Sequence, residues 1–257
     1  MAACQNDLSK FAEFAKFPFD PIQRAKRIEC MVMRGSARSY YRTRFAPQFD
    51  CPVTVDSVGC CLQCAYCWNA LRNETMKLGD FWEPEEIATK AVKIANKEKT
   101  WRFRVSGCEA ILGRASTDHF CQFIEALQEA GKVEFVLLET NGIMLGYDES
   151  LVKSLSKFKD VLGVRVAIKG EDPQQFEKLS GAKASSFKYQ LRSLELLYQH
   201  EVPSRPAIMS TFMDVLKISE LTKIHHEDID VERLKFYPIT KKSLIERGCW
   251  DMRKVKA

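Results

Sequence analysis

Hydrophobic positions follow two alternating patterns in this chain from about residue 52 onward. Short apolar runs predict strands at Pro52–Val58, Trp101–Val105, Val133–Leu138, Val161–Ile168, Ala207–Thr211 and Arg233–Tyr237. Between them, apolar residues recur at every third or fourth position, which predicts helices at Glu83–Lys97, Thr117–Ala130, Glu149–Phe158, Ala184–His200 and Leu216–His225. Thr117 is expected to cap its helix at the N-terminus, and Gly131 is expected to follow that helix directly.

The order of these elements predicts the fold class. Continuous apolar strands that alternate with helices are typical of an α/β protein with a parallel sheet. About six right-handed crossovers curve such a sheet into a partial (β/α)6 barrel. The chain of 257 residues is too short for eight units plus its N-terminal part. In such a barrel, the loops after the carboxyl ends of the strands form the functional site.

The two ends of the chain differ from this regular middle part. Residues 1–50 show only a short helical pattern, followed by the breakers Pro18 and Pro21. We therefore expect them to form an N-terminal extension packed on the core. Residues 51–240 are expected to form the core domain, and residues 241–257 a basic C-terminal tail.

The overall composition is that of a globular protein, with 46% hydrophobic and 28% charged residues. No apolar run approaches the roughly 18 residues that a membrane-spanning helix needs. The first residues carry neither the basic nor the apolar part of a signal peptide. These features predict a cytoplasmic protein with no contact with a membrane.

The net charge of +5 is unevenly placed. Residues 232–257 carry eight Lys or Arg against three Asp or Glu. A second basic stretch contains Arg34, Arg38, Arg42 and Arg44 and no acidic residue. Two interpretations stay open: these are solvated surfaces, or they form a patch for a polyanion such as RNA or for an acidic partner protein.

The candidate chemistry lies in the cysteines. The chain has ten cysteines, and four of them fall between Cys60 and Cys67. In a chain of this size without an export signal, such a group indicates metal binding by reduced thiolates rather than disulfides. The neighbouring Cys51 is a further candidate ligand, whereas the pair His225-His226 has no partner motif and is assigned no metal.

Three kinds of metal site compete for this group of cysteines. Cys61, Cys64 and Cys67 match the start of a ferredoxin run, but Leu71 and Arg72 stand where that run has its fourth cysteine and its proline. A zinc site would use the pair Cys64 and Cys67, yet no second pair follows to complete a tetrahedron. Cys51 is the remote ligand that such a zinc site would need.

The third interpretation uses Cys60, Cys64 and Cys67, which have the spacing C-x3-C-x2-C. Three thiolates hold three irons of a [4Fe–4S] cubane and leave the fourth iron without a protein ligand. An open iron can chelate the amino and carboxylate groups of an amino acid.

This segment, with Tyr66 just before the last cysteine, resembles the signature of the radical SAM superfamily. The resemblance implies a [4Fe–4S] cluster that reductively cleaves S-adenosyl-L-methionine (SAM) to a 5′-deoxyadenosyl radical. It also implies an external low-potential electron donor, a flavodoxin or a ferredoxin. Tyr66 and Asn69 are the residues that it places beside the adenine.

Further matches follow the predicted strands. Gly107-Cys108-Glu109 resembles the family's Gly-Gly-Glu motif, which holds the methionine end of SAM, with Cys108 in place of the second glycine. The segment Glu139-Thr140-Asn141-Gly142 resembles the Asp-Thr-Asn-Gly of glycyl-radical activating enzymes such as the pyruvate formate-lyase activating enzyme.

Two basic residues complete the resemblance. Lys169 matches a lysine near SAM in the activating enzymes, and Arg205 matches an arginine that contacts SAM. This chain departs from the pattern at Ala167, where those enzymes have an aspartate, and at Ile239, where they have a histidine.

Together these residues predict a radical SAM enzyme that abstracts hydrogen from a substrate. The substrate suggested by the resemblance is a glycyl-radical enzyme that the chain would activate. Two alternatives stay open: a radical SAM modifier of RNA or protein, and an iron–sulfur or zinc protein that does not cleave SAM. Cys51 and Cys61 are candidates for auxiliary ligands.

Overall fold

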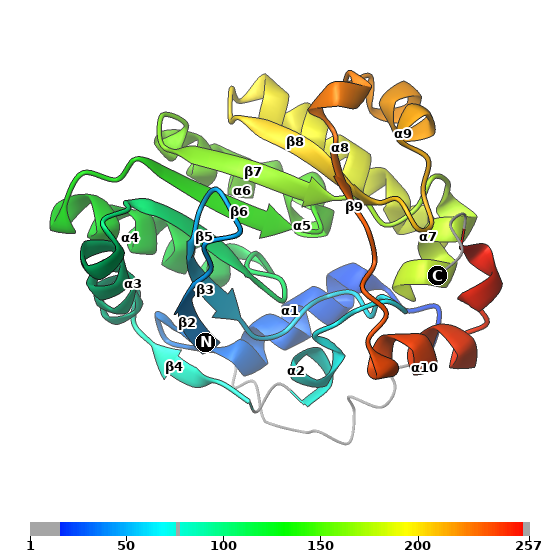
Figure 1. Cartoon of the computed structure of the whole chain (residues 1–257), viewed down its shortest axis with the longest axis horizontal. Helices are drawn as coiled ribbons and strands as arrows, with labels where there is room; N and C mark the ends of the chain where they lie inside the picture. Colours follow the sequence, from blue (N-terminus) through cyan, green and yellow to red (C-terminus); the bar gives the residue numbers. More distant parts are fainter. Residues whose placement is uncertain (1–15, 76–77, 254–257) are drawn as a thin grey trace.

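The computed structural model describes residues 16–75 and 78–253 of the chain. Its centre is a curved, open sheet with six parallel strands, as predicted (Figure 1). In spatial order these are β3 (Val53–Ser57), β5 (Arg102–Gly107), β6 (Phe135–Thr140), β7 (Leu162–Ala167), β8 (Ser204–Met209) and β9 (Asp230–Glu232). The predicted α/β partial barrel is therefore confirmed.

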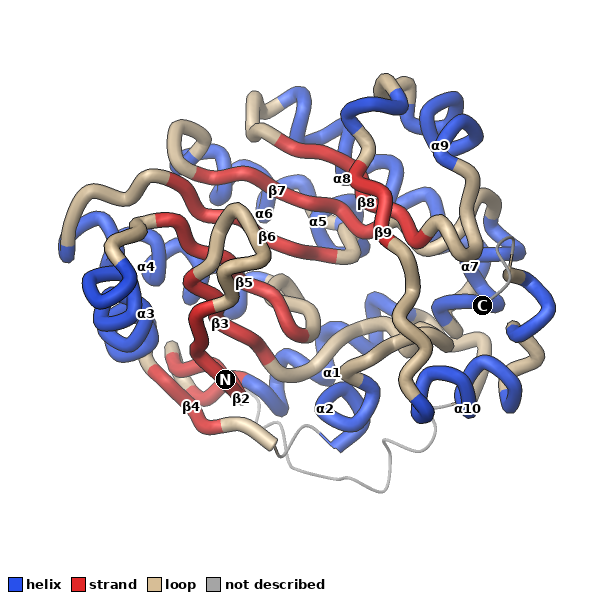
Figure 2. The backbone as a smooth tube through the Cα atoms, in the orientation of Figure 1, coloured by secondary structure: helices blue, strands red, loops and turns tan. Residues whose placement is uncertain are grey.

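Helices connect the parallel strands and cover the outer side of the sheet (Figure 2). They are α3 (Pro84–Glu98), α4 (Arg114–Ala130), α5 (Ile143–Tyr147), α6 (Glu149–Leu155), α7 (Pro173–Ser180), α8 (Phe187–Gln199) and α9 (Val215–Thr222). Their apolar faces bury residues such as Ala91, Phe123 and Leu197 completely or almost completely. This burial is the main term that stabilises each crossover against the sheet. The short helices α5 and α7 lie in segments that the sequence pattern left as loops.

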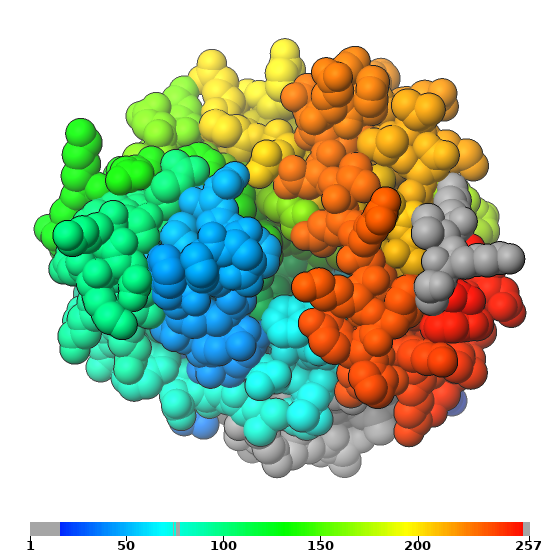
Figure 3. All heavy atoms as spheres, in the orientation of Figure 1, coloured from blue at the N-terminus to red at the C-terminus, as the bar shows by residue number. Residues whose placement is uncertain are grey.

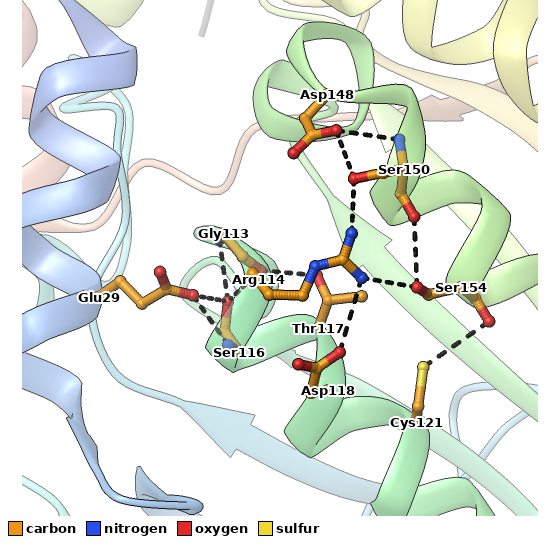
Figure 4. A network of polar contacts seen from close by, with 10 residues as sticks. All are labelled: Glu29, Gly113, Arg114, Ser116, Thr117, Asp118, Cys121, Asp148, Ser150 and Ser154. Carbon is orange, nitrogen blue, oxygen red and sulfur yellow. Dashed lines mark hydrogen bonds and ion pairs between the residues drawn. The ribbon is translucent and has the colours of Figure 1, made fainter. Parts of the chain in front are cut away.

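Helix α4 begins at Arg114, three residues before the predicted start at Thr117 (Figure 4). The reason is a partner from outside the helix. Glu29 of helix α1 (Pro21–Val32) accepts hydrogen bonds from the backbone N–H and the hydroxyl of Ser116, at 2.8 and 2.7 Å. This carboxylate satisfies donors that the first turn of a helix leaves free, so Thr117 is not needed as the cap. The hydroxyl of Thr117 donates instead to the carbonyl of Gly113.

Residues 1–50, expected as an N-terminal extension packed on the core, add β1 (Met33–Arg34) and β2 (Ala37–Phe45) to the sheet, and Asp80–Trp82 adds β4. Strand β2 pairs antiparallel with β3, and β1 and β4 pair with β2. Helix α1 leads directly into β1 and contacts β1 and α5. Residues 1–15, which include the predicted short helical pattern, lie outside the described residues.

The basic stretch lies on β1 and β2, and three of its arginines have partners within the protein. Arg38 is buried and donates to the carbonyls of Val58 and Glu109, at 3.2 and 2.6 Å. Arg42 and Arg44 both pair with the buried carboxylate of Asp56, at 2.7 and 2.9 Å. Arg38 is thus used inside the protein, whereas Arg42 pairs with Asp56 while 43% of its side chain stays exposed.

The last strand and the C-terminal segment also differ from prediction. Strand β9 ends at Glu232, and the predicted strand Arg233–Tyr237 is an extended connection without sheet pairing. Helix α10 (Pro238–Glu246) follows it. Leu244 and Cys249 are fully buried, so the described part of the expected tail packs against the core.

Within residues 16–75 and 78–253, none of the helices combines the length and the apolar character of a membrane-spanning segment.

Candidate functional site

A cavity of about 320 Å³ opens at the carboxyl ends of the parallel strands. Figure 3 shows a hollow here, between the blue segment that follows β2 and the C-terminal part of the chain in orange. Ten predicted site residues line this cavity: Cys60, Cys64, Tyr66, Cys67, Gly107, Cys108, Glu109, Glu139, Asn141 and Lys169. The structure therefore brings the three motifs and the cysteines to one place.

The cysteine loop (residues 58–69) connects β3 to helix α2 (Ala70–Thr75) and is fixed by backbone contacts. Its turn needs Gly59, whose φ is +84° and whose position would put a Cβ 2.7 Å from the side chain of Ile28. The backbone N–H groups of Gln63 and Ala65 donate to the carbonyls of Ser180 and Leu179, at 2.9 and 2.8 Å. The loop is thus held along much of its length before any cofactor binds.

The structure separates the adjacent cysteines of this loop. Cys60, Cys64 and Cys67 line the cavity, whereas Cys61 is fully buried and contacts Asn141. This arrangement favours the set of cysteines with C-x3-C-x2-C spacing over the ferredoxin-like set. Cys51, proposed as an auxiliary or zinc ligand, lines a different cavity.

Burial shapes the ionisation of the three cavity cysteines. Burial raises the pKa of the Cys67 thiol to about 12. Burial also raises the pKa of the Cys64 thiol, although the positive charges of Lys169 and Arg247 lower it in part. A hydrogen bond from Cys61 lowers the pKa of Cys60. Bound metal supplies the positive charge that makes buried thiolates favourable.

The donor set fits an iron–sulfur cubane. Among the described residues, no three His, Cys, Asp or Glu side chains are arranged to hold one metal ion. A cubane places each thiolate on a different iron, so its cysteines face a common space without converging on one point. Cys60, Cys64 and Cys67 meet this requirement, since all three line the same cavity.

The end of β5 is joined closely to the start of the cysteine loop. Gly107 has a φ of +93°, and a Cβ there would lie 2.9 Å from the backbone N and O of Ser57. The N–H groups of Cys108 and Glu109 donate to the carbonyls of Ser57 and Gly59, at 3.1 and 2.9 Å. Any side chain at position 107 would force these two segments apart.

Glu109 acts within the protein rather than as a free acid. Its buried carboxylate accepts hydrogen bonds from the N–H of Ile111, the hydroxyl of Thr140 and the N–H of Asn141, at 3.1, 2.8 and 2.7 Å. Burial raises the pKa of Glu109, and these bonds oppose the rise. Three of its roughly four acceptor positions are filled, so the carboxylate orients the strand ends. The sequence had assigned it to the methionine end of SAM.

Asn141 and Lys169 approach the cysteines from β6 and β7. The amide nitrogen of Asn141 lies 3.6 Å from the sulfur of Cys60. The Lys169 ammonium lies 5.7 Å from the centre of the Tyr66 ring. Gln190 of α8, which the sequence analysis missed, ties these strand ends together: its amide donates to the carbonyl of Asn141 and accepts from the N–H of Lys169, at 2.6 and 3.0 Å.

Two predicted residues do not line this cavity. Asn69 is buried, and its amide donates to the hydroxyl of Tyr41 and the sulfur of Cys108, both at 3.2 Å. Arg205 lines a second cavity of about 950 Å³ and pairs with Asp230 at 3.1 Å. Asn69 thus supports the site from outside, and Arg205 lies away from the cysteines.

A charged layer, whose two arginines the sequence analysis missed, lines the first cavity through Arg104, Glu139, Arg165 and Glu232. Arg165 lies at the centre of this layer and pairs with Asp230, Glu232 and Glu139, at 2.6, 2.8 and 3.5 Å. Arg104 adds a second cation beside Glu139, at 3.6 Å. Polar residues at alternate positions of otherwise apolar strands were the available signal, because every second residue of a strand points into the barrel.

Comparisons with known proteins match this geometry. The profile of the family described as "Radical SAM superfamily" matches residues 54–225. The structure of a tagged form of "anSMEcpe with bound AdoMet" is similar, with a TM-score of 0.50 and 20% identity over 70% of this chain and 49% of that one. SuiB from Streptococcus suis has a TM-score of 0.52 and 17% identity, over 70% of this chain and 38% of its own.

These two likenesses show the fold alone, and the chain spans about half or less of the length of either protein. No curated protein matches the chain.

Proposed function

Because the chain belongs to the radical SAM superfamily, we propose that Cys60, Cys64 and Cys67 hold its [4Fe–4S] cluster and that it cleaves SAM reductively. The family implies both cofactors. The observation that carries the proposal is that three cysteines of one loop line the same cavity as the ends of β5, β6 and β7. When bound, the cluster and SAM supply a 5′-deoxyadenosyl radical that removes a hydrogen atom from a substrate.

The protein's own residues prepare this site. The cysteine loop is fixed by backbone bonds, so the thiolates are held in place before the cofactor arrives. The amide of Asn141 faces the sulfur of Cys60 and Lys169 adds a positive charge, and both favour an anionic cofactor. The side chains that line the cavity also limit the access of water to a reactive radical.

For SAM, the binding surface follows from the strand ends. Gly107 and Cys108 offer backbone groups at the edge of the cavity, and Glu139 and Lys169 provide charges of both signs. Tyr66 stacks on Phe212 at 5.1 Å and has a buried hydroxyl without a partner among the described residues. We assign the aromatic Tyr66 to the adenine side and the β5 end to the methionine side.

As substrate we propose a glycine of a partner enzyme, so that the chain would be a glycyl-radical activating enzyme. Support comes from the segment Glu139–Gly142, whose side chains at 139 and 141 line the cavity. The opening at the surface gives an outside chain a way in (Figure 3). Modification of RNA loses part of its support, because Arg38, Arg42 and Arg44 are engaged within the protein. The electron donor would be a flavodoxin or a ferredoxin.

An anaerobic assay tests this function. Reconstituted protein is mixed with dithionite, SAM and glycine-loop peptides deuterated at the glycine Cα, and 5′-deoxyadenosine is quantified by mass. The proposal expects product, deuterium in that product, and loss of both in Cys64→Ala. A complete cubane that yields no 5′-deoxyadenosine would instead indicate a binding protein. 5′-Deoxyadenosine without deuterium would contradict the proposed activase role and would still support reductive cleavage of SAM.

A further inference from the structure

The C-terminal segment makes a direct contact with the cysteine loop. Arg247, the residue after α10, donates one guanidinium N–H to the carbonyl of Gln63 and another to the carbonyl of Lys178, the latter at 2.9 Å. Gln63 lies between Cys60 and Cys64 in the sequence. A residue near the end of the chain thus bonds to the backbone of the loop that carries the candidate ligands.

This contact completes a set of bonds along one face of the loop. Lys178 and the two residues after it form the C-terminal end of α7, which lies beside the C-terminal segment in Figure 1. That end already accepts N–H groups of the loop at Ser180 and Leu179. Arg247 adds the link in the opposite direction, because it donates to a loop carbonyl. Its forked guanidinium suits two carbonyls at once.

The charge of Arg247 has no carboxylate partner at ion-pair distance within residues 16–75 and 78–253. The Phe17 ring covers one side of the guanidinium, with 4.3 Å between the guanidinium carbon and the ring centre. A half-buried cation that bonds only to neutral carbonyls is incompletely compensated. The charge of Arg247, like that of Lys169, acts on Cys64. Arg247 reaches the loop at the carbonyl of Gln63, the residue before Cys64, whereas Lys169 lines the cavity.

The other cations of the segment do not share this position. Lys242 is exposed on α10 and pairs with Glu246 of the same helix at 3.7 Å. Arg253 and Lys241 lie over the Trp250 ring, at 3.6 and 5.4 Å from its centre. Within the described part of the basic segment, Arg247 is the cation that bonds to the cysteine loop.

We propose that Arg247 is a positioning residue that fixes the cysteine loop and offsets the negative charge of the iron–sulfur cluster held there. This inference rests on the proposed assignment of Cys60, Cys64 and Cys67 as ligands. It gives the basic C-terminal segment a role inside the site, in place of the polyanion patch considered from sequence. A nearby positive charge stabilises the reduced, more negative cluster and so raises its reduction potential.

The test compares the reconstituted wild-type protein with Arg247→Gln, Arg247→Lys and the control Lys242→Gln. Midpoint potentials are measured by redox titration followed by electron paramagnetic resonance (EPR), and iron retention is measured after incubation with a chelator. Arg247→Gln is expected to shift the potential to more negative values and to lose iron several-fold faster. Arg247→Lys keeps the charge but not the forked bonds, so its potential should stay near wild type while iron loss accelerates. Lys242→Gln should match the wild type in both.

Several outcomes would overturn the inference. If Arg247→Gln retains both the wild-type potential and the wild-type rate of iron loss, Arg247 has no role toward the cluster. If Lys242→Gln shifts the potential as much as Arg247→Gln, the effect is one of general surface charge. These results would leave SAM cleavage by the wild type intact, so they are distinguishable from failure of the proposed function. A wild-type protein that holds no [4Fe–4S] cluster would contradict both the proposed function and the inference about Arg247.

Discussion

The amide nitrogen of Asn141 lies 3.6 Å from the sulfur of Cys60, across more than eighty residues of sequence. The contact links the end of β6 to the cysteine loop. Neighbouring residues fix the orientation of Asn141. Its backbone N–H donates to the Glu109 carboxylate at 2.7 Å, and its carbonyl accepts from the Gln190 amide at 2.6 Å. Hydrogen bonds to ligating sulfurs are one of the means by which a protein tunes an iron–sulfur cluster.

The first prediction concerns this amide. Asn141→Ala removes the N–H donor to Cys60 and is expected to shift the midpoint potential of the reconstituted cluster to more negative values, as measured by redox titration. The exposed residue Gln122 of α4 provides a control, since Gln122→Ala touches no part of the site. Equal potentials for Asn141→Ala and the control would show that the contact has no effect on the cluster.

The second prediction separates steric crowding from backbone strain. Gly107 and Gly35 both have positive φ, +93° and +64°, but a Cβ meets the backbone of Ser57 only at position 107, and nothing within 4 Å at position 35. Gly35→Ala should lower the free energy of unfolding by about 1 kcal/mol from the φ angle alone. Gly107→Ala should cost about 2 kcal/mol more, because the crowding adds to the strain.

Urea denaturation of the reconstituted proteins measures both values, and SAM binding is measured in parallel. Gly107→Ala should also weaken SAM binding, since the displaced β5 end borders the cavity. Equal destabilisation by the two substitutions would contradict the close packing of β5 on the cysteine loop.

The third prediction is a pH dependence of stability. His119 of α4 is buried and bonds through Nδ1 to the carbonyl of Ser36 at 2.7 Å, and burial lowers its pKa to about 4. As the pH falls, the unfolded chain binds this proton first, at about 6.5. The stability from neutral His119 is therefore present above pH 6.5 and is lost as the pH falls toward 4.

Between pH 7 and pH 5 this residue alone should cost about 2 kcal/mol of the free energy of unfolding. His119→Phe keeps a ring beside Tyr40, whose centre lies 5.6 Å away, and removes the titration. Denaturation curves at the two pH values should show that the variant loses less free energy of unfolding than the wild type, by that amount. The same loss in both proteins would mean that His119 does not titrate as its burial requires.

The parallel strands could be predicted because their apolar runs are local and continuous. The exception is β9, predicted at Arg233–Tyr237 and found at Asp230–Glu232. The aromatic residues of 233–237 favour a strand by propensity, but Arg165 pairs with Asp230 and Glu232 and fixes the earlier residues against β8. Such a contact between distant residues leaves no trace in the local pattern.

Strand β2 was hidden for the same reason. Its alternating arginines suggest a solvated segment, but Arg42 and Arg44 pair with Asp56, which is buried on the neighbouring strand β3. The cavity itself was largely predictable, because its residues follow strand ends and carry recognisable motifs. Arg104 and Arg165 were missed, because a charge at an alternate strand position does not by itself show that its partners, Glu139 and Glu232, lie on other strands of the sheet.

The central claim is a cubane held by Cys60, Cys64 and Cys67 with one iron free to bind SAM, and EPR of the reduced protein with and without SAM tests it most directly. Cys61 is the matched control, because it adjoins Cys60 but is buried away from the cavity. The account predicts a [4Fe–4S] signal that changes when SAM is added, kept in Cys61→Ala and lost in Cys60→Ala. A signal that SAM leaves unchanged, or one that depends on Cys61 and not on Cys60, would contradict it.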